Sequence, residues 1–148
     1  MLYIASDHAG FKLKEYLKSY FNKKNIKYKD LGPYSEDRVD YPLYAKKLAL
    51  KVKKGKSKGI LICGTGTGMV IGANRIKGIR AVLAYDVYSA KMSREHNDAN
   101  VLCLRGREIY FKKQILIVNT WLNTKFSNIL RHKKRIKMLD QWKYSLQS

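Results

Sequence analysis

The chain has 148 residues, of which 45% are hydrophobic, and it carries a formal net charge of +20 at pH 7. This length suits one domain that buries its own core, and we expect a single domain over residues 1–148. No apolar run reaches the length of a membrane span, and neither a signal peptide nor a disulfide framework is visible. We therefore expect a soluble, cytoplasmic protein without membrane contact.

The positive charge raises the possibility of nucleic-acid binding. The basic residues are mostly lysines, however, and they are scattered over predicted helices and turns instead of lying in one stripe with aromatic residues. A lysine-rich surface explains this distribution best, because net charge speaks to solubility more than to a particular site. We expect no specific nucleic-acid partner. The two cysteines, Cys63 and Cys103, also lack the spacing of a metal site.

The first predicted strand covers residues 2–5, and an amphipathic helix follows over residues 11–21, where apolar residues recur with lysines between them. Asp7 is well placed to cap this helix, and His8 follows it. Ligands of open α/β sheets bind at the carboxyl ends of strands. Asp7 and His8 are therefore candidate binding residues.

The alternation of strands and helices continues to the end of the chain. Further strands are predicted over 26–31, 60–62, 80–84 and 101–104, and further helices over 43–53, 69–76, 87–95, 108–122 and 129–146. Such an α/β order predicts a parallel sheet with helices on both faces. The strand ends that carry polar or glycine residues then fall along one edge of the sheet.

Three glycines, Gly64, Gly66 and Gly68, end the central apolar strand and lead into the helix predicted from residue 69. Alternate glycines let the backbone turn tightly while several N–H groups point at one spot, which is the geometry of an anion cradle. The N-terminus of the following helix favours the same anion. We therefore expect this loop to bind a phosphate or a developing oxyanion.

Cys63 is the last residue of that strand, where the loop begins. A thiol beside a helix N-terminus is favoured as the thiolate, which is the reactive form. Cys63 is therefore a candidate base or nucleophile. The alternative is that it only fills space, since cysteine often behaves as a small buried hydrophobe.

Two other kinds of glycine loop compete with this interpretation. A Walker loop requires Lys and then Ser or Thr after its last glycine, whereas Met69 and Val70 follow Gly68 here. The dinucleotide fingerprint fits better, because Asp86 follows the next apolar strand about twenty residues on. The glycines of that fingerprint are spaced differently, however, and follow the first strand of a fold, whereas the loop here follows a middle strand. Dinucleotide binding stays open as an alternative.

Five short motifs together resemble one family. They are Ser6-Asp7-His8-Ala9-Gly10, Asp40-Tyr41-Pro42, Cys63-Gly64-Thr65-Gly66-Thr67-Gly68, His96-Asn97-Asp98 and Arg131-His132-Lys133-Lys134-Arg135. In this order they look like the type B ribose 5-phosphate isomerases, in the group that also holds galactose 6-phosphate isomerase subunits. The resemblance runs from residue 2 to about residue 140 and is far more specific than any single motif.

The resemblance implies an aldose-ketose isomerase that interconverts ribose 5-phosphate and ribulose 5-phosphate through a cis-enediolate, without metal or organic cofactor. It also implies a Rossmann-like three-layer sandwich, with a five-stranded, mainly parallel sheet between helices and a C-terminal helix. Members are homodimers or homotetramers with the site at the dimer interface. Which subunit supplies which residue does not follow from the sequence.

The family's residue roles carry over to matching positions. Cys63 is implied to be the base, His96 with help from Thr65 to open the furanose ring, and the N–H groups of Gly64, Gly66, Thr67 and Gly68 to stabilise the oxyanion. Asp7, His8, Tyr41 and Asn97 are implied to contact the sugar, and Arg107, Arg131 and Arg135 to bind the phosphate. His132 is interpreted as structural.

The residue chemistry agrees with these roles. Proton transfer between adjacent carbons needs one base near them and preorganised donors where the oxyanion develops. Arg131 and Arg135 are four residues apart, hence on one helical face, and guanidinium groups match phosphate oxygens. One branch of the family uses a glutamate just after the loop as its base; Met69 stands there, which leaves Cys63.

Two alternatives remain open from the sequence. The first is isomerisation of a six-carbon sugar phosphate such as allose or galactose 6-phosphate, since the length of the pocket does not follow from the sequence. The second is a non-enzymatic binder of nucleic acid or of a dinucleotide.

Overall fold

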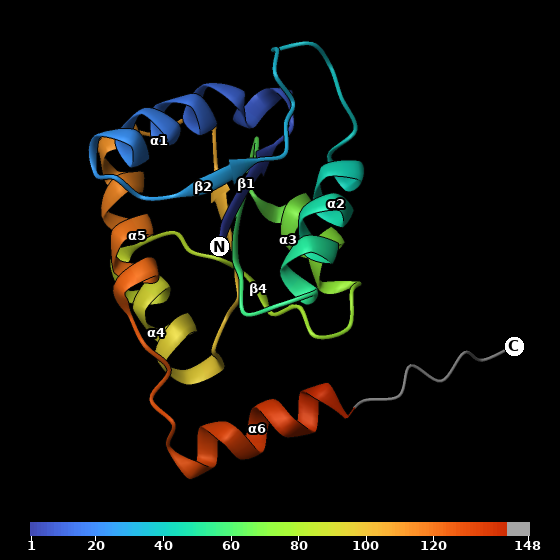
Figure 1. Ribbon diagram of the computed structural model, residues 1–148, viewed down its shortest axis with the longest axis vertical. Helices are drawn as coiled ribbons and strands as arrows, with labels where there is room; N and C mark the ends of the chain where they lie inside the picture. Colours follow the sequence, from blue (N-terminus) through green and yellow to red (C-terminus); the bar gives the residue numbers. More distant parts are fainter. Residues whose placement is uncertain (142–148) are drawn as a thin grey trace, which may run out of the picture.

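A computed structural model describes residues 1–141 of the chain. Its centre is a sheet of five strands in the order β2-β1-β3-β5-β4, and every neighbouring pair is parallel (Figure 1). The strands are β1 (Leu2–Ser6), β2 (Tyr28–Asp30), β3 (Lys58–Cys63), β4 (Ala81–Leu83) and β5 (Val101–Arg105). The parallel sheet predicted from the alternation of elements is confirmed.

Helices cover both faces of the sheet, as expected for a three-layer sandwich. On one face lie α1 (Phe11–Lys23), α4 (Val87–Asn97) and α5 (Phe111–Asn123), and on the other lie α2 (Tyr41–Lys53) and α3 (Thr67–Asn74) (Figure 1). The central strand β3 separates the two cores, because Ile60 and Ile62 belong to the first and Leu61 and Cys63 to the second. Burial on both faces explains its wholly apolar sequence.

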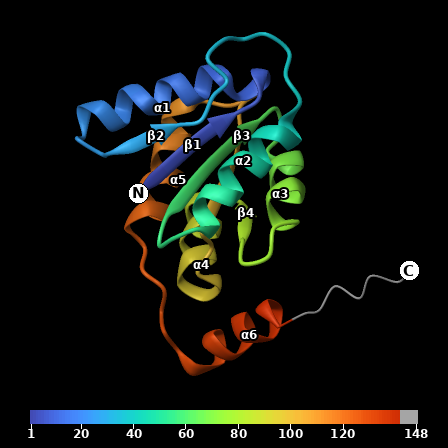
Figure 2. The same ribbon diagram turned by 45° about the vertical axis from the view of Figure 1, so that its right-hand side comes forward.

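The last helix, α6 (Leu130–Asp140), lies at the amino-terminal edge of the sheet, below α4 in Figures 1 and 2. The segment before it is attached to α4, because the Ser127 N–H donates to the carbonyl of Glu95. An ion pair of 3.6 Å between Arg80 and Asp140 holds the far end of α6. Residues 142–146 of the predicted terminal helix lie outside the described residues. Within residues 1–141, no helix is long and apolar enough to cross a membrane.

Several predicted boundaries were wrong by a few residues. The second strand is shorter than the predicted 26–31, and α5 starts at Phe111 and not at 108, because Glu108 has a left-handed φ of 53° that a helix does not accept. Asp7 does not cap α1. It caps a short 3₁₀-helix, η1 (His8–Gly10), by accepting a hydrogen bond of 2.9 Å from the Gly10 N–H.

A buried ionic cluster joins α1 to the end of β2. The Lys14 side chain is fully buried and donates to Asp30 at 2.7 Å and to Glu15 at 2.9 Å. Lys18 also pairs with Asp30 at 2.7 Å, and the second oxygen of that carboxylate accepts from the Gly32 N–H. A buried ammonium group requires such partners, so this cluster fixes the start of the loop that follows β2.

At the outer edge of β4, one side chain takes the place of a further strand. The Asn74 amide donates to the Ala81 carbonyl at 2.9 Å and accepts from the Ala81 N–H at 2.8 Å. Because Asn74 is the last residue of α3, this pair of hydrogen bonds also attaches the helix to the edge of the sheet.

Candidate active site

The first group of predicted site residues meets at the carboxyl edge of the sheet. Because β1, β3 and β5 are parallel neighbours, with Ser6 opposite Ile62 and Cys63 opposite Arg105, the residues that follow them share this edge. The Arg107 N–H donates to the Gly64 carbonyl at 3.2 Å. The structure therefore places Arg107 beside the glycine loop of the same chain.

Cys63 ends β3, as predicted, and only 5% of its surface is exposed. Its sulfur accepts a hydrogen bond of 3.1 Å from the Gly66 N–H, across the turn that leads into α3. The sulfur therefore has a backbone donor beside it, at the start of α3.

The loop from Gly64 to Gly68 needs glycine for a steric reason at Gly66. This residue has φ of 84°, and a Cβ there would lie 2.5 Å from the Leu83 side chain and 3.1 Å from the Leu104 carbonyl. Thr65 is exposed at the tip of the loop, and its hydroxyl accepts from the Thr67 N–H at 3.4 Å. Helix α3 starts at Thr67, two residues earlier than predicted, so its free N–H groups belong to the loop itself.

Three further predicted residues line the same edge. Asp7 is buried and fixed by the Gly10 bond, and its own N–H donates to the Ile62 carbonyl. The ring of Tyr41, the first residue of α2, lies over Gly68, where a Cβ would come within 2.9 Å of ring carbons. The structure therefore brings Asp7, His8, Tyr41, the glycine loop and Arg107 around Cys63.

His8 faces a hollow that the sequence did not reveal. Its Nδ1 lies 3.3 Å from the Val39 carbonyl, and Arg38, Val39 and Asp40 line a hollow of about 390 Å³ with it. Arg38 was not among the predicted site residues. The closeness of the loop before α2 to η1 is a tertiary feature, and no sequence spacing signals it.

Gly106 was also missed. A Cβ at this residue would lie 2.8 Å from the Ala9 carbonyl and 2.9 Å from the Gly10 Cα, so only glycine lets the loop after β5 approach η1. The sequence Arg105-Gly106-Arg107 after an apolar strand contained this signal, because a glycine at a strand end often marks close backbone approach.

The second group of predicted residues lies elsewhere in the chain. His96 and Asn97 end α4, which starts at the carboxyl edge and returns to the amino edge before β5 begins. Arg131 and Arg135 belong to α6. Figure 2 shows this helix at the same amino edge, at the opposite end of the molecule from the loop that precedes α2. One chain therefore does not bring His96, Asn97, Arg131 and Arg135 to Cys63.

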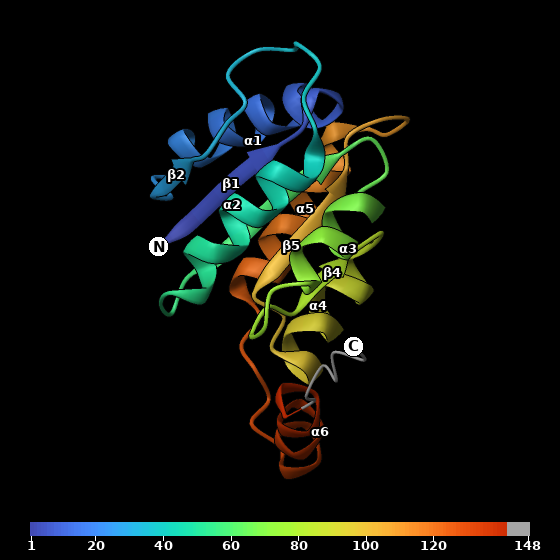
Figure 3. The same ribbon diagram turned by 90° about the vertical axis from the view of Figure 1, so that its right-hand side faces the viewer.

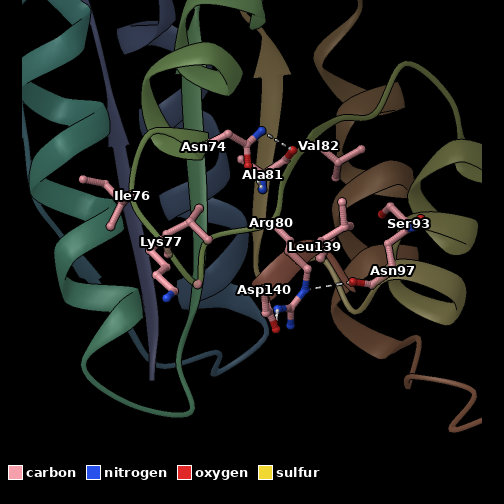
Figure 4. A pocket seen from close by; sticks show the side chains of 13 residues that line it. Asn74, Ile76, Lys77, Arg80, Ala81, Val82, Ser93, Asn97, Leu139 and Asp140 are labelled. Carbon is pink, nitrogen blue, oxygen red and sulfur yellow. Dashed lines mark hydrogen bonds and ion pairs between the residues drawn. The ribbon is translucent and has the colours of Figure 1, made fainter. Parts of the chain in front are cut away.

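A cavity of about 430 Å³ opens in this second region, between β4, the end of α4 and α6 (Figure 4). Asn97 lines it together with Arg80, Leu139 and Asp140. The Arg80 guanidinium donates to the Asn97 carbonyl at 2.9 Å and pairs with Asp98 at 3.1 Å. Figure 3, from the side, shows the C-terminal part of α4 directly above α6.

His96 contacts His132, which the sequence led us to interpret as structural. The two imidazole rings lie 4.4 Å apart between centroids, tilted by 39°. His132 is 3% exposed, and its Nδ1 lies 2.7 Å from the Ser127 hydroxyl. Burial, and then the nearby His96, lower the pKa of His132, which favours the neutral form of this side chain.

Asp86, which suggested a dinucleotide site, has a structural explanation. It caps α4, accepts from the Ser89 N–H, and forms a capping box with the Ser89 side chain. These hydrogen bonds lower the pKa of the Asp86 carboxyl. Within residues 1–141, no group of three His, Cys, Asp or Glu side chains is arranged to hold a metal ion.

Comparison with known proteins agrees with this geometry. The ribose/galactose isomerase family model matches residues 2–139. The chain is 41% identical over 134 residues to the Escherichia coli protein named ribose-5-phosphate isomerase B, covering 90% of this chain and 89% of that protein. A probable ribose-5-phosphate isomerase B of Mycoplasma genitalium is 42% identical over 138 residues, or 91% of this chain and 90% of that one.

Solved structures give the same result. A ribose 5-phosphate isomerase from Thermotoga maritima is similar with a TM-score of 0.92 and 47% identity, over 95% of this chain and 97% of that one. The Mycoplasma genitalium ribose-5-phosphate isomerase B with bound ribulose-5-phosphate gives 0.89 and 40% identity, over 94% and 93%. The family match and these relatives confirm what the five motifs indicated: the chain belongs to the ribose/galactose isomerase family and is an isomerase.

Proposed function

We propose that this enzyme interconverts ribose 5-phosphate and ribulose 5-phosphate, with Cys63 as the base. The names of the relatives support this substrate, and so does the ribulose-5-phosphate bound to the Mycoplasma genitalium structure. The observation that carries the mechanism is the hydrogen bond from the Gly66 N–H to the Cys63 sulfur, because it joins a candidate base to the loop whose N–H groups suit an oxyanion.

In the proposed reaction the Cys63 thiolate removes the C2 proton of the open-chain aldose. The carbonyl at C1 becomes the oxyanion of a cis-enediolate, which the N–H groups of residues 64–68 stabilise. The thiol then returns the proton to C1, while the proton of the C2 hydroxyl passes to the oxygen on C1, which gives the ketose with its C2 carbonyl and C1 hydroxyl. Asp7, His8 and Tyr41 contact the sugar, and no metal or organic cofactor takes part.

Two copies of the chain complete the proposed site. Cys63 and His96 lie at opposite edges of the sheet in one chain, yet the aldose must be opened and deprotonated in one place. In a two-fold dimer, the Cys63 group of one copy faces the His96 group of the other, and the arrangement occurs twice. His96, with Thr65, then opens the furanose ring, Asn97 contacts the sugar, and Arg107, Arg131 and Arg135 bind the phosphate.

The surface between the two groups is suited to such contact. Ile71 on α3 and Tyr85, Val87 and Tyr88 around the start of α4 are large apolar residues that are 53%, 79%, 44% and 71% exposed. Large apolar side chains that are exposed in a single chain are candidates for an interface between copies. A homodimer, or a homotetramer built from it, would cover them.

A six-carbon sugar phosphate is the second candidate substrate, since the family includes galactose isomerases. The length available between the base and the phosphate-binding arginines decides between five and six carbons. A non-enzymatic binder of nucleic acid or dinucleotide has less support, because Asp86 already serves as a helix cap.

The test is turnover of ribose 5-phosphate to ribulose 5-phosphate by the purified protein with a chelator present. Wild type is compared with Cys63→Ala and with the control Cys103→Ala, which removes the other buried thiol. We expect activity in wild type and control and none in Cys63→Ala, which should still bind the substrate. Equal activity in Cys63→Ala would exclude Cys63 as the base, and an inactive wild type would redirect the assay to six-carbon sugar phosphates.

A further inference from the structure

We infer that His132 is a positioning residue that holds the His96 ring in place and connects it to the phosphate-binding arginines. The inference rests on the proposed function, because it assumes that His96 opens the sugar ring. Its basis is the geometry of α6 and of the segment that joins this helix to α5.

The first observation is the burial of His132. It is the one buried residue of α6 within the described part of the helix, whose other residues are mostly exposed and half of them basic. The buried ring lies against His96, 4.4 Å away between centroids. These two rings therefore form a direct contact between α6 and the end of α4, and through it α6 limits how the His96 ring can turn.

The second observation is a hydrogen-bonded support behind His132. The Ser127 hydroxyl lies 2.7 Å from His132 Nδ1 and accepts from the Ile129 N–H at 3.3 Å. The Ser127 N–H donates to the Glu95 carbonyl at 3.0 Å, one residue before His96. Ser127 therefore ties the His132 ring and the backbone of α4 to the same point, and a ring held in this way cannot turn freely.

The third observation is the charge around the pair. Glu95 and His96 on α4 and Arg131 and Arg135 on α6 are the titratable or charged groups near His132. Three of these four groups are cationic or become cationic on protonation, so an additional positive charge, from protonation of His132, is disfavoured. A neutral His132 adds no positive charge beside the His96 ring.

This arrangement has a consequence for ring opening. Arg131 adjoins His132 and Arg135 lies one turn further along the same helix. A movement of His132 therefore displaces both the phosphate-binding groups and His96. The imidazole that opens the ring and the arginines that hold the other end of the substrate form one unit with a fixed spacing.

The experiment separates ring opening from proton transfer. Ribose 5-phosphate is cyclic in solution, whereas ribulose 5-phosphate is acyclic because its C5 oxygen carries the phosphate. Turnover of ribose 5-phosphate requires ring opening, and exchange of the C1 proton of ribulose 5-phosphate in D₂O requires only proton transfer. Both rates are measured at saturating substrate for wild type, His132→Ala and His132→Asn, with Lys137→Ala as the control on the exposed side of α6.

We expect His132→Ala to lower the turnover of ribose 5-phosphate by about 10²-fold, the cost of a small displacement of a catalytic group, while C1 exchange changes much less. His132→Asn should recover part of the turnover, since its amide can still bond Ser127. The acid limb of the pH profile should shift in both variants, and NMR should show a changed titration of the His96 imidazole. Lys137→Ala should resemble wild type.

Unchanged turnover and unchanged His96 titration in His132→Ala would overturn the inference. Equal losses in the two assays, with a lower melting temperature and no rescue by Asn, would assign His132 a structural role only. A wild type that fails both assays would refute the proposed function. In that case the NMR titration of His96 tests the contact by itself, and the same titration in wild type and His132→Ala would refute the contact.

Discussion

The sulfur of Cys63 and the backbone nitrogen of Gly66 are 3.1 Å apart and share a hydrogen bond across one turn. Gly66 is also the residue that caps α3 with a left-handed φ of 84°. The backbone conformation that starts the helix is therefore the same one that orients a donor toward the proposed base. Changes to this turn should affect stability and catalysis together.

Gly66→Ala tests this coupling, with Gly78→Ala as a matched control. The two glycines have φ of 84° and 85°, but a Cβ at Gly78 meets nothing within 4 Å, whereas at Gly66 it meets Leu83 at 2.5 Å. We expect Gly78→Ala to lower the free energy of unfolding by about 1–2 kcal/mol through backbone strain alone. Gly66→Ala should cost more and should also lower kcat. Equal effects of the two changes on stability and kcat would contradict the coupling.

Mixing two inactive variants tests the two-copy site. Cys63→Ala and His96→Ala should each be inactive toward ribose 5-phosphate as pure proteins. After unfolding and refolding together, a statistical mixture should regain about a quarter of the wild-type activity, because half of its dimers contain one intact site out of two. Mixing either variant with itself gives the control. A mixture without activity, from protein shown to have exchanged subunits, would indicate that each chain forms its own site.

Arg135→Ala should mainly raise the KM for the sugar phosphate. A guanidinium-phosphate hydrogen bond contributes about 1.5–3 kcal/mol, which corresponds to about a 10- to 100-fold change in KM. Lys137→Ala removes a positive charge from the same helix without a proposed phosphate contact, and its KM should stay close to wild type. The same increase in both variants would show that KM follows the net charge of α6 and not one bound group.

Asp30→Asn should lower the free energy of unfolding without changing any residue of the proposed active site. Lys14 is fully buried, and removing its carboxylate partner should cost about 3 kcal/mol, the low end of the range because Glu15 remains bonded. The control is Glu36→Gln, whose pair with Lys12 is exposed and should contribute at most about 1 kcal/mol. Urea unfolding at pH 7 measures both changes.

The same pair predicts a pH dependence. Burial opposes ionisation of Asp30, but hydrogen bonds from Lys14 and Lys18 outweigh it and lower the pKa of the carboxyl. A carboxyl with a lowered pKa in the folded state stabilises the protein above its unfolded pKa, and this contribution is lost as the pH falls through the folded value. The difference between wild type and Asp30→Asn should therefore shrink below about pH 4. A difference that stays constant down to pH 2 would contradict the assignment.

The fold followed from local sequence patterns, but the packing of α6 did not. The alternation of apolar strands and amphipathic helices predicts a parallel sheet. The position of Cys63 at the end of a strand predicts that it lies on the carboxyl edge of this sheet. The remoteness of His96 also follows from topology, since a helix between two parallel strands must return to the amino edge. Where α6 packs did not follow, because its basic sequence shows no apolar stripe and its one buried residue is the polar His132.

The motifs indicated which residues matter and not always what they do. Asp7 was expected to cap α1, and the turn of η1 between them could not be foreseen from a three-residue stretch. Arg38 and Gly106 lie in two loops that each approach η1 only in the folded chain. Such contacts depend on tertiary packing, which the spacing of residues along the chain does not indicate.

The double hydrogen bond between Asn74 and Ala81 limits how copies of this protein can associate. An uncovered outer strand is a template onto which another chain adds its own strand, and repeated addition leads to open-ended aggregates. Here the position at Ala81 is already taken by an amide from the same molecule. A copy that approached this edge of the sheet would therefore make contact through side chains on helices and loops and not through an added strand at Ala81.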